Sequence, residues 1–498
     1  MNYTLPENTL LKLSEFISSN LALYFPKERW NDLERNIVSA SKEFGFKNVE
    51  EFIQEIISSP LKHEHMEILA SNLTINETYF WREPQTFEAL EQKIIPELIS
   101  KQKYGGKRLR IWSAGCSTGE EPYSIAIALK RSIPDIDDWN ISILATDISP
   151  RILCKAAKGE YGQWSFRSVP EWLKEKYFFQ NENKKLEIIP EIKSMVKFEY
   201  QNLAEDVYPS SLNNTNAMDI IYCRNVLMYF TQDRFRKVAN GLYNSLVDGG
   251  YLIVSASELS MQNFPQFLSI NVPGMVLYKK TSTKNKNRLN YTLEELSPGP
   301  VFTPLTSAPN LTLELMKIQP IEAEMEILKA EAIPYKPDPI LEETLNLYSQ
   351  GDYTDVIDKL QKDDQTSDER ILLIKAYANQ GKLLDAIESC KSAIAVDKTD
   401  PRLHYLYATI LQENNELNEA VLSLKRAIFL DSNFVLSHYS LGKIYERIGN
   451  IKNANKCYAN VLTILDQCSK DEILFESEGL TAGRFKEIIT ASNQTRVL

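Results

Sequence analysis

The sequence predicts an α/β domain with a parallel sheet, preceded by a small helical unit and followed by a helical repeat solenoid. From about residue 108 to 280, short apolar runs rich in β-branched and aromatic residues alternate with helical stretches, a pattern typical of buried parallel strands. Residues 1–75 carry apolar side chains at spacings of three and four, which indicates amphipathic helices. Residues 340–470 repeat with a period of 34, which indicates stacked helix pairs.

Composition places the chain among ordinary soluble globular proteins. Of its 498 residues, 43% are apolar and 25% are charged, and 56 basic against 67 acidic side chains leave a net charge of −11. Such a balance argues against general binding of nucleic acid or of an anionic membrane, because both need positive potential. The N-terminus lacks the basic region of a signal peptide, and no run of 18 apolar residues exists. We therefore expect no membrane insertion.

Cysteine and histidine usage argues against a disulfide framework and against a metal centre. The six cysteines are scattered without a CxxC pair, and the chain has four histidines. A reducing cytoplasm is the simplest location for such a chain. No metal is expected.

The expected domain boundaries follow from changes in residue composition and in the pattern of apolar residues along the chain. The α/β domain extends over residues 76–280, with MVLYKK (275–280) as an expected edge strand and an insertion at 164–200 read as a helix plus a small β excursion. Residues 281–339 hold eight of the 22 prolines and are expected to form an extended linker. The tail, 471–498, is polar and has room for one helix.

The repeats at 340–470 resemble tetratricopeptide repeats. Gly381, Asn415 and Gly449 are each 34 residues apart, and alanines recur at the same offset. Because a helix pair of this size cannot bury its apolar face alone, the units are expected to stack. The groove of such a stack would hold an unidentified peptide or protein partner.

Two motifs of the α/β domain mark the carboxyl ends of its first two strands. IWSAGCSTGEEPYS (111–124) reads as a strand, a loop with Gly115 and Gly119, and a helix beginning near Pro122. Read alone, this loop fits either a ligand cradle or a tight turn, and Glu120 and Glu121 disfavour a phosphate. Asp147 ends ILATD, where an acid can accept hydrogen bonds from both ribose hydroxyls; an Asx turn or a helix N-cap is the alternative. Together they favour adenosine carried on a sulfonium, as in S-adenosylmethionine.

Two further polar segments are candidates for the same site. NETYFWRE (76–83) places Asn76, Thr78 and Arg82 in an aromatic stretch just ahead of the sheet. DIIYCRNVLMYF (219–230) is a buried strand followed by Arg224-Asn225 and then Tyr229. Polar residues after a parallel strand lie at its carboxyl end, where open α/β sheets bind ligands, although an ordinary surface loop is the alternative.

Five segments of the chain resemble a known family. In chain order they are LTINETYFWRE, IWSAGCSTGEEPYSIAIAL, ATDIS, YCRNVLMYF and GGYLIVSASE. The family is the chemotaxis receptor methyltransferase (CheR) family, and the resemblance covers about residues 5–280. The resemblance implies a Rossmann-like methyltransferase domain with an N-terminal all-α domain and a small β insertion. It implies methyl transfer from S-adenosylmethionine, which becomes S-adenosylhomocysteine, to glutamates on the cytoplasmic coiled coil of a chemoreceptor. Glu120 is a weaker candidate for the cofactor site than its neighbour. The implied cofactor contacts are Asn76, Thr78, Arg82, Glu121, Asp147, Asn202, Leu203, Arg224 and Asn225.

The chemistry of a carboxylate attacking a methyl group suggests catalytic roles for Arg82 and Tyr229. Arg82 would orient the incoming carboxylate, and Tyr229 would donate a hydrogen bond to it or form a wall of the methyl pocket. The stretch FFQNENKKLEII is short and free of glycine, which argues against a receptor pentapeptide tether. Two other functions stay open. The chain could methylate another protein or a small acid, or it could be a non-catalytic cofactor-binding scaffold whose function lies in its repeats.

Overall fold

The computed structural model describes eight segments of the chain. Asn76 and nearly all of the expected linker lie outside them. The described residues are 5–21, 23–58, 63–74, 77–102, 106–259, 264–281, 339–362 and 365–496.

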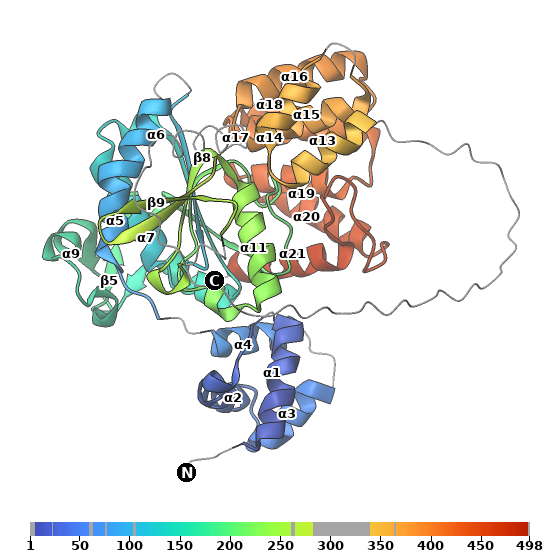
Figure 1. Ribbon diagram of the computed structural model, residues 1–498. Helices are drawn as coiled ribbons and strands as arrows, with labels where there is room; N and C mark the ends of the chain where they lie inside the picture. The colour runs from blue at the N-terminus through green and yellow to red at the C-terminus, as the bar shows by residue number, and fades with distance from the viewer. Residues whose placement is uncertain are drawn as a thin grey trace, which may run out of the picture.

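The N-terminal unit is a set of helices packed on its own core (Figure 1). Leu13 and Ile17 are spaced by four residues, as are Leu33 and Ile37, so each pair lies on one helix face. All four side chains are fully buried. The helices are α1 (Glu7–Leu21), α2 (Trp30–Glu43), α3 (Val49–Ser58) and α4 (His63–Leu73).

The middle domain is built on a seven-stranded sheet in the order β6-β2-β1-β7-β8-β10-β9. The first five strands in this order are parallel, and β10 is antiparallel to both of its neighbours. The strands are β1 (Arg108–Ala114), β2 (Asn140–Asp147), β6 (Val196–Tyr200), β7 (Met218–Tyr222), β8 (Leu246–Ile253), β9 (Leu268–Val272) and β10 (Met275–Lys279).

The expected edge strand is not at the edge. β10 pairs with β8 on one side and with β9 on the other, so β9 closes the sheet. The sequence-based assignment relied on continuous apolar runs and missed β9 because LSINV instead alternates apolar and polar residues, as a half-buried strand does. The two strands form a hairpin across Gly274, whose φ of +79° suits glycine.

Helices cover both faces of the sheet, as Figure 1 shows. Alternate residues of β1 point to opposite faces: Ile111 lies in one core, with residues of α7, and Trp112 lies in the other, with residues of α11. The helices of this domain are α5 (Pro84–Ala89), α6 (Ile95–Gln102), α7 (Glu120–Ser132), α8 (Pro150–Lys158) and α11 (Gln232–Ser245). Helix α7 therefore begins at Glu120, two residues before Pro122.

The β insertion is a separate three-stranded sheet in the order β3-β5-β4. It lies between residues 160 and 188, whereas Val196–Tyr200, placed in the insertion from the sequence, pairs with β2 in the main sheet. Phe80, from the segment ahead of the sheet, packs among aromatic rings of the insertion. The elements are β3 (Glu160–Tyr161), α9 (Glu171–Tyr177), β4 (Phe178–Gln180), β5 (Leu186–Ile188) and α10 (Pro190–Lys193).

The C-terminal region is all-helical and stacks as consecutive helix pairs. Helix α21 (Ala482–Arg496) follows the repeats and occupies the tail. In the described part of the chain, no helix is long and apolar enough to cross a membrane. The repeat helices are α13 (Pro339–Ser349), α14 (Tyr353–Leu360), α15 (Ser367–Asn379), α16 (Leu383–Val396), α17 (Pro401–Glu413), α18 (Leu417–Leu430), α19 (Val435–Arg447) and α20 (Ile451–Leu465).

The repeats pack directly on the amino-terminal edge of the main sheet. Glu413, at the end of α17, lies 3.0 Å from Arg110 and 3.4 Å from Arg108, both on β1, and accepts a hydrogen bond from Asn216 (2.7 Å). Gly381, one of the glycines with period 34, has a φ of +70°, and a Cβ there would lie 2.5 Å from the Arg108 guanidinium. The repeats are therefore a structural partner of the sheet.

We predict that Glu413→Ala destabilises the protein strongly. The side chains of Glu413 and Arg110 are only 5% and 6% exposed, so the substitution leaves a buried guanidinium without its carboxylate. Removing one partner of a buried pair costs about 3–5 kcal/mol. The first transition of chemical unfolding measures this loss. Glu343→Ala, which breaks the exposed pair with Lys359, is the control, and an equally small loss in both variants would contradict the prediction.

Candidate functional site

The carboxyl ends of four neighbouring strands form a cleft that has two adjoining pockets. Strand order reverses between β1 and β7, the place where open α/β sheets bind ligands. The open space in the two pockets, which includes space continuous with the solvent, is about 480 and 640 Å³. We name them the arginine pocket (Glu77, Thr78, Tyr79, Arg82, Phe87, Gly115, Cys116, Ser117, Glu121, Arg224, Asn225) and the aspartate pocket (Leu21, Leu23, Thr74, Gly115, Ser117, Asp147, Ile148, Gln201, Asn202, Leu203, Asn225, Val226, Tyr229, Phe230).

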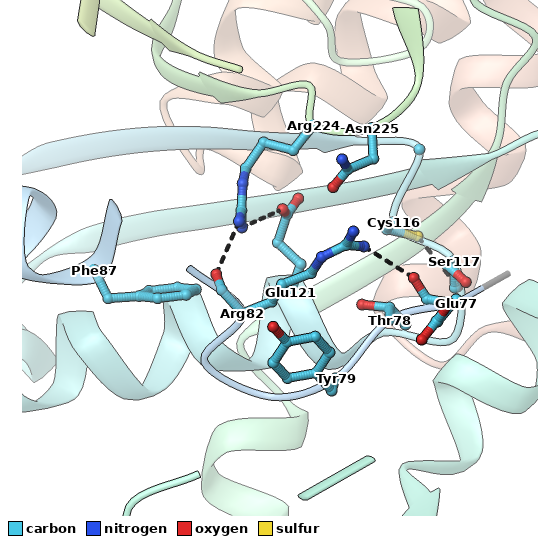
Figure 2. Close-up of a pocket in the computed structure, with 11 residues that line it drawn as sticks. Glu77, Thr78, Tyr79, Arg82, Phe87, Cys116, Ser117, Glu121, Arg224 and Asn225 are labelled. Carbon is cyan, nitrogen blue, oxygen red and sulfur yellow. Dashed lines mark hydrogen bonds and ion pairs between the residues drawn. The ribbon is translucent and has the colours of Figure 1, made fainter. Parts of the chain in front are cut away.

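A buried ion pair forms one wall of the arginine pocket. Nη1 of Arg224 lies 3.1 Å from Oε2 of Glu121, whose other oxygen accepts a hydrogen bond from Ser113 (2.7 Å). Nη2 of Arg224 donates to the backbone carbonyl of Arg82 (2.8 Å) and pairs with Glu83 (3.1 Å). Figure 2 shows Glu121 between the guanidinium groups of Arg224 and Arg82. The pocket therefore presents charges of both signs.

Burial and charge shift the ionisation of this pair. Burial raises the pKa of the Glu121 carboxyl, and Arg224 opposes the rise. Burial lowers the pKa of Arg224, but the carboxylates of Glu121 and Glu83 raise it by more, so its pKa is raised overall. The guanidinium therefore stays protonated and can hold a carboxylate in place.

The glycine loop after β1 joins the two pockets. Gly115 has a φ of +82°, and a Cβ there would lie 2.3 Å from the side chain of Val226. A larger residue would therefore displace the segment that follows β7. The loop thus lets the ends of β1 and β7 approach closely across the cleft.

Asp147 combines a structural role with a position in the aspartate pocket. One carboxylate oxygen accepts the amide of Ser149 (3.0 Å) and forms an Asx turn, and the other accepts the amide of Ser117 (3.0 Å). The N-cap of α8 is Ser149, not Asp147. Burial raises the pKa of Asp147, and these two amides oppose the rise. The carboxylate retains acceptor capacity for a ligand hydroxyl.

Asn202 and Leu203 follow β6 and close the far side of the aspartate pocket. The amide of Asn202 donates to Oδ2 of Asp206 (2.6 Å), and the carbonyl of Leu203 accepts from the hydroxyl of Tyr208 (2.7 Å). Opposite them, Asn225 has a φ of +60°, and its amide donates to Glu258 (2.8 Å). These contacts fix the backbone on both sides of the pocket.

Tyr229 lies in the aspartate pocket and contacts the N-terminal helical unit. Its carbonyl accepts the amide of Tyr24 (2.7 Å), and the guanidinium of Arg29 stacks 4.8 Å from its ring centroid. Burial raises the pKa of the Tyr229 phenol, and Arg29 opposes the rise. Its ring therefore helps the N-terminal unit close one side of this pocket.

Every predicted site residue in the described part of the chain lines one of the two pockets. The structure does not bring Arg82 and Tyr229, the two predicted catalytic residues, into the same pocket. Glu120 faces away from both, because its carboxylate accepts hydrogen bonds from Thr118 (2.6 Å) and Ser165 (2.9 Å). Asn76 lies outside the described residues.

Sequence reasoning missed Ser117 and Gln201. Ser117 lines both pockets, and Gln201 lines the aspartate pocket. The hydroxyl of Ser117 and the side-chain nitrogen of Gln201 are buried without a hydrogen-bond partner. Gln201 directly follows a predicted strand, and Ser117 lies in the glycine loop after another, so the rule that polar residues at carboxyl strand ends meet at one edge would have found them.

A family model matches this part of the chain. Residues 76–273 match the model described as "CheR methyltransferase, SAM binding domain". Residues 408–449 and 436–464 match two tetratricopeptide-repeat models. The matched domain binds S-adenosylmethionine, the methyl donor.

The residues of the cleft fit that cofactor. Buried polar atoms without partners, such as the Ser117 hydroxyl, require a ligand or water to complete their hydrogen bonding. In the arginine pocket, the opposite charges of Arg82 and Glu121 suit the carboxylate and the ammonium of an amino acid. In the aspartate pocket, the Asp147 carboxylate can accept hydrogen bonds from ribose hydroxyls, and Leu203 provides an apolar wall for a base. The arginine and aspartate pockets thus match the two halves of the molecule.

Curated relatives match most of their own length. A "Chemotaxis protein methyltransferase" of Borreliella burgdorferi is 33% identical over 52% of this chain and 90% of the relative. "Chemotaxis protein methyltransferase 1" of Pseudomonas aeruginosa is 34% identical over 44% of this chain and 78% of the relative, and a "Probable chemotaxis protein methyltransferase" of Rhizobium etli is 34% identical over 41% and 75%. With its sheet, cleft and matching residues in place, the chain belongs to the chemotaxis protein methyltransferase family and carries C-terminal tetratricopeptide repeats.

Proposed function

We propose that this chain methylates glutamate side chains on the cytoplasmic coiled coil of a chemoreceptor, forming methyl esters. The observation that carries the proposal is the arginine pocket: a cationic rim at Arg82 beside the buried Arg224–Glu121 pair, continuous with a second pocket suited to a nucleoside. A cation at the mouth of a cofactor site suits an anionic acceptor such as a carboxylate. The family of the chain supports the same substrate class, and the reaction would take place in the cytoplasm.

In this proposal each pocket holds one half of the cofactor. Thr78, Arg82, Glu121 and Arg224 hold the amino-acid half. In the other pocket, Asp147 accepts hydrogen bonds from the ribose hydroxyls, and the remaining contacts lie around the nucleoside. The latter are Asn202, Leu203 and Asn225, with Ser117 and Gln201 added from the structure. Asn76, outside the described residues, remains a proposed contact from the resemblance.

Methyl transfer requires the protein mainly to align the substrate carboxylate with the methyl group of the cofactor. When bound, S-adenosylmethionine supplies a methyl group on a positively charged sulfur. A substrate glutamate is already ionised at neutral pH, since its ordinary pKa is about 4.3, so no residue of this chain has to act as a general base. Holding the acceptor in line and excluding water lowers the barrier by about 7–11 kcal/mol.

Arg82 and Tyr229 take different parts in this alignment. Arg82 is held by the carbonyl of Glu77 (2.9 Å) at the mouth of the arginine pocket, where its guanidinium orients the incoming carboxylate. Tyr229 lies in the other pocket, so we assign its ring to the pocket wall rather than to the carboxylate. The protein thus needs only one strong cationic contact to the acceptor, which leaves that carboxylate free to react.

The repeats would recruit or regulate rather than catalyse. Their groove between α15 and α16 includes Arg370, Tyr377 and Glu388, a polar surface suited to a peptide or protein. The product ester removes one negative charge from the receptor bundle, which shifts the balance between its two signalling states.

We predict that Asp147→Ala weakens binding of S-adenosylhomocysteine by about 1.5–3 kcal/mol, because a hydrogen bond to a charged group is lost. Titration calorimetry on the full chain measures the affinity. Asp137→Ala, an exposed acid at 94% side-chain accessibility, is the control. An unchanged affinity in Asp147→Ala would remove this residue from the ribose.

We predict that Arg82→Ala lowers the rate of methyl transfer by about 10- to 100-fold, the effect of losing a charge-assisted contact to the acceptor. The fold should survive because Arg82 lies at the surface of the pocket. Steady-state transfer to a receptor fragment at saturating S-adenosylmethionine measures the rate, so that a weaker contact between residue 82 and the cofactor does not limit it. Arg236→Ala, on the exposed face of α11, should retain wild-type turnover. Wild-type turnover in Arg82→Ala would end its assigned role.

The substrate itself is tested by transfer of a labelled methyl group to receptor cytoplasmic fragments. We expect label on glutamate that is released by mild base, as methyl esters are. Label only on other proteins or on small acids would replace the proposed substrate. Binding of the cofactor without transfer to any acceptor would leave a non-catalytic scaffold.

A further inference from the structure

The tail helix α21 packs against two elements that carry the aspartate pocket. It contacts α8, which begins just after Asp147, and β6, which leads into Asn202. Its apolar residues Phe485 and Ile489 are buried in the core of the repeats. One face of α21 therefore contacts the repeats, and another contacts α8 and β6, which carry the aspartate pocket.

Arg484 makes the polar contacts of this junction. Its Nε lies 2.7 Å from Oδ1 of Asp206, and its Nη2 donates to the hydroxyl of Tyr200 (3.2 Å). Nη1 pairs with Glu487 on the same helix (2.7 Å). The side chain of Asp206 is only 3% exposed, so Arg484 is the cation that compensates its burial. Burial raises the pKa of Asp206, and Arg484 opposes the rise.

Asp206 connects Arg484 to the wall of the aspartate pocket. While Oδ1 faces Arg484, Oδ2 accepts the amide of Asn202 at 2.6 Å. Asn202 lines the aspartate pocket, and its side-chain oxygen caps the turn at the amide of Ala204 (3.0 Å). A displacement of the Asp206 carboxylate would therefore move the backbone at the wall of the pocket.

We propose that Arg484 is a positioning residue for the cofactor: through Asp206 it holds Asn202 in the conformation that receives the nucleoside, so that docking of the tail and repeats sets cofactor affinity. The inference rests on the proposed use of the aspartate pocket for the nucleoside, and does not depend on the methyl acceptor. A partner that pulled the repeats or α21 away would lower cofactor binding through this one contact.

The test compares Arg484→Met with Lys443→Met in the full chain. Lys443 forms an interdomain ion pair of the same length, 2.7 Å, with Glu199 on β6. Glu199 keeps a second cation, Lys197, and the structure gives it no hydrogen bond to a pocket residue. We expect calorimetry with S-adenosylhomocysteine to show about a tenfold loss for Arg484→Met and less than a twofold loss for Lys443→Met, within the usual range of site–site coupling.

A double variant separates positioning from simple docking. Asp206→Asn in the Arg484→Met background removes the unpaired buried charge yet keeps an oxygen for the amide of Asn202, so most of the lost affinity should return. It also keeps the test open if Arg484→Met alone does not fold, which thermal unfolding will show. An unchanged affinity in Arg484→Met, an equal loss in Lys443→Met, or no recovery in the double variant would overturn the inference.

Comparing Asp147→Ala, Arg484→Met and the transfer assay separates the role of Arg484 from the proposed methyl transfer. If Asp147→Ala and Arg484→Met both bind like the wild type, the nucleoside does not lie in the aspartate pocket. If only Arg484→Met does so, the pocket stands and the tail has no influence on it. Absence of transfer to receptor glutamate, with normal binding, leaves the role of Arg484 intact.

Discussion

Parallel pairing of β6, β2, β1 and β7 determines where the cleft and the repeats lie. It brings the segments that follow four strands, far apart in the sequence, to one edge of the sheet. Asp147 and Asn202 thereby line the aspartate pocket together, and the segments after β1 and β7 meet where strand order reverses. Because all four strands end at this edge, their amino ends form the opposite edge, which is left for the repeats.

The two edges of the sheet carry charge in different ways. At the amino-terminal edge, Glu413 pairs with both Arg108 and Arg110 within the protein, and the contact serves stability. At the carboxyl edge, Arg224 and Glu121 compensate each other, while Arg82 remains at the pocket mouth. A buried, balanced pair beside an accessible cation lets the site receive a zwitterionic ligand and an anionic acceptor without burying an unpaired charge.

Much of this arrangement could be predicted from the sequence, because strand-end rules act locally. Asp147 and Arg224 each follow an apolar run directly, and both lie in the cleft. Contacts set by tertiary packing were beyond such rules. Nothing in the repeat pattern indicates that Glu413 faces β1, and a polar tail gives no sign that Arg484 reaches Asp206, since each contact joins residues more than 250 positions apart. The edge strand β9 is a different case, because its alternating LSINV and the two-residue turn to β10 are local signals that differ from the continuous apolar runs of the buried strands.

A crystal structure of the full chain with S-adenosylhomocysteine tests most directly whether the two pockets hold the two halves of the cofactor. We expect the ligand to extend across both pockets, with its ribose hydroxyls at Asp147, its amino-acid half between Arg82 and Glu121, and its sulfur near the glycine loop. A nucleoside bound elsewhere, or a cleft filled by the protein's own side chains in the presence of saturating ligand, would contradict it.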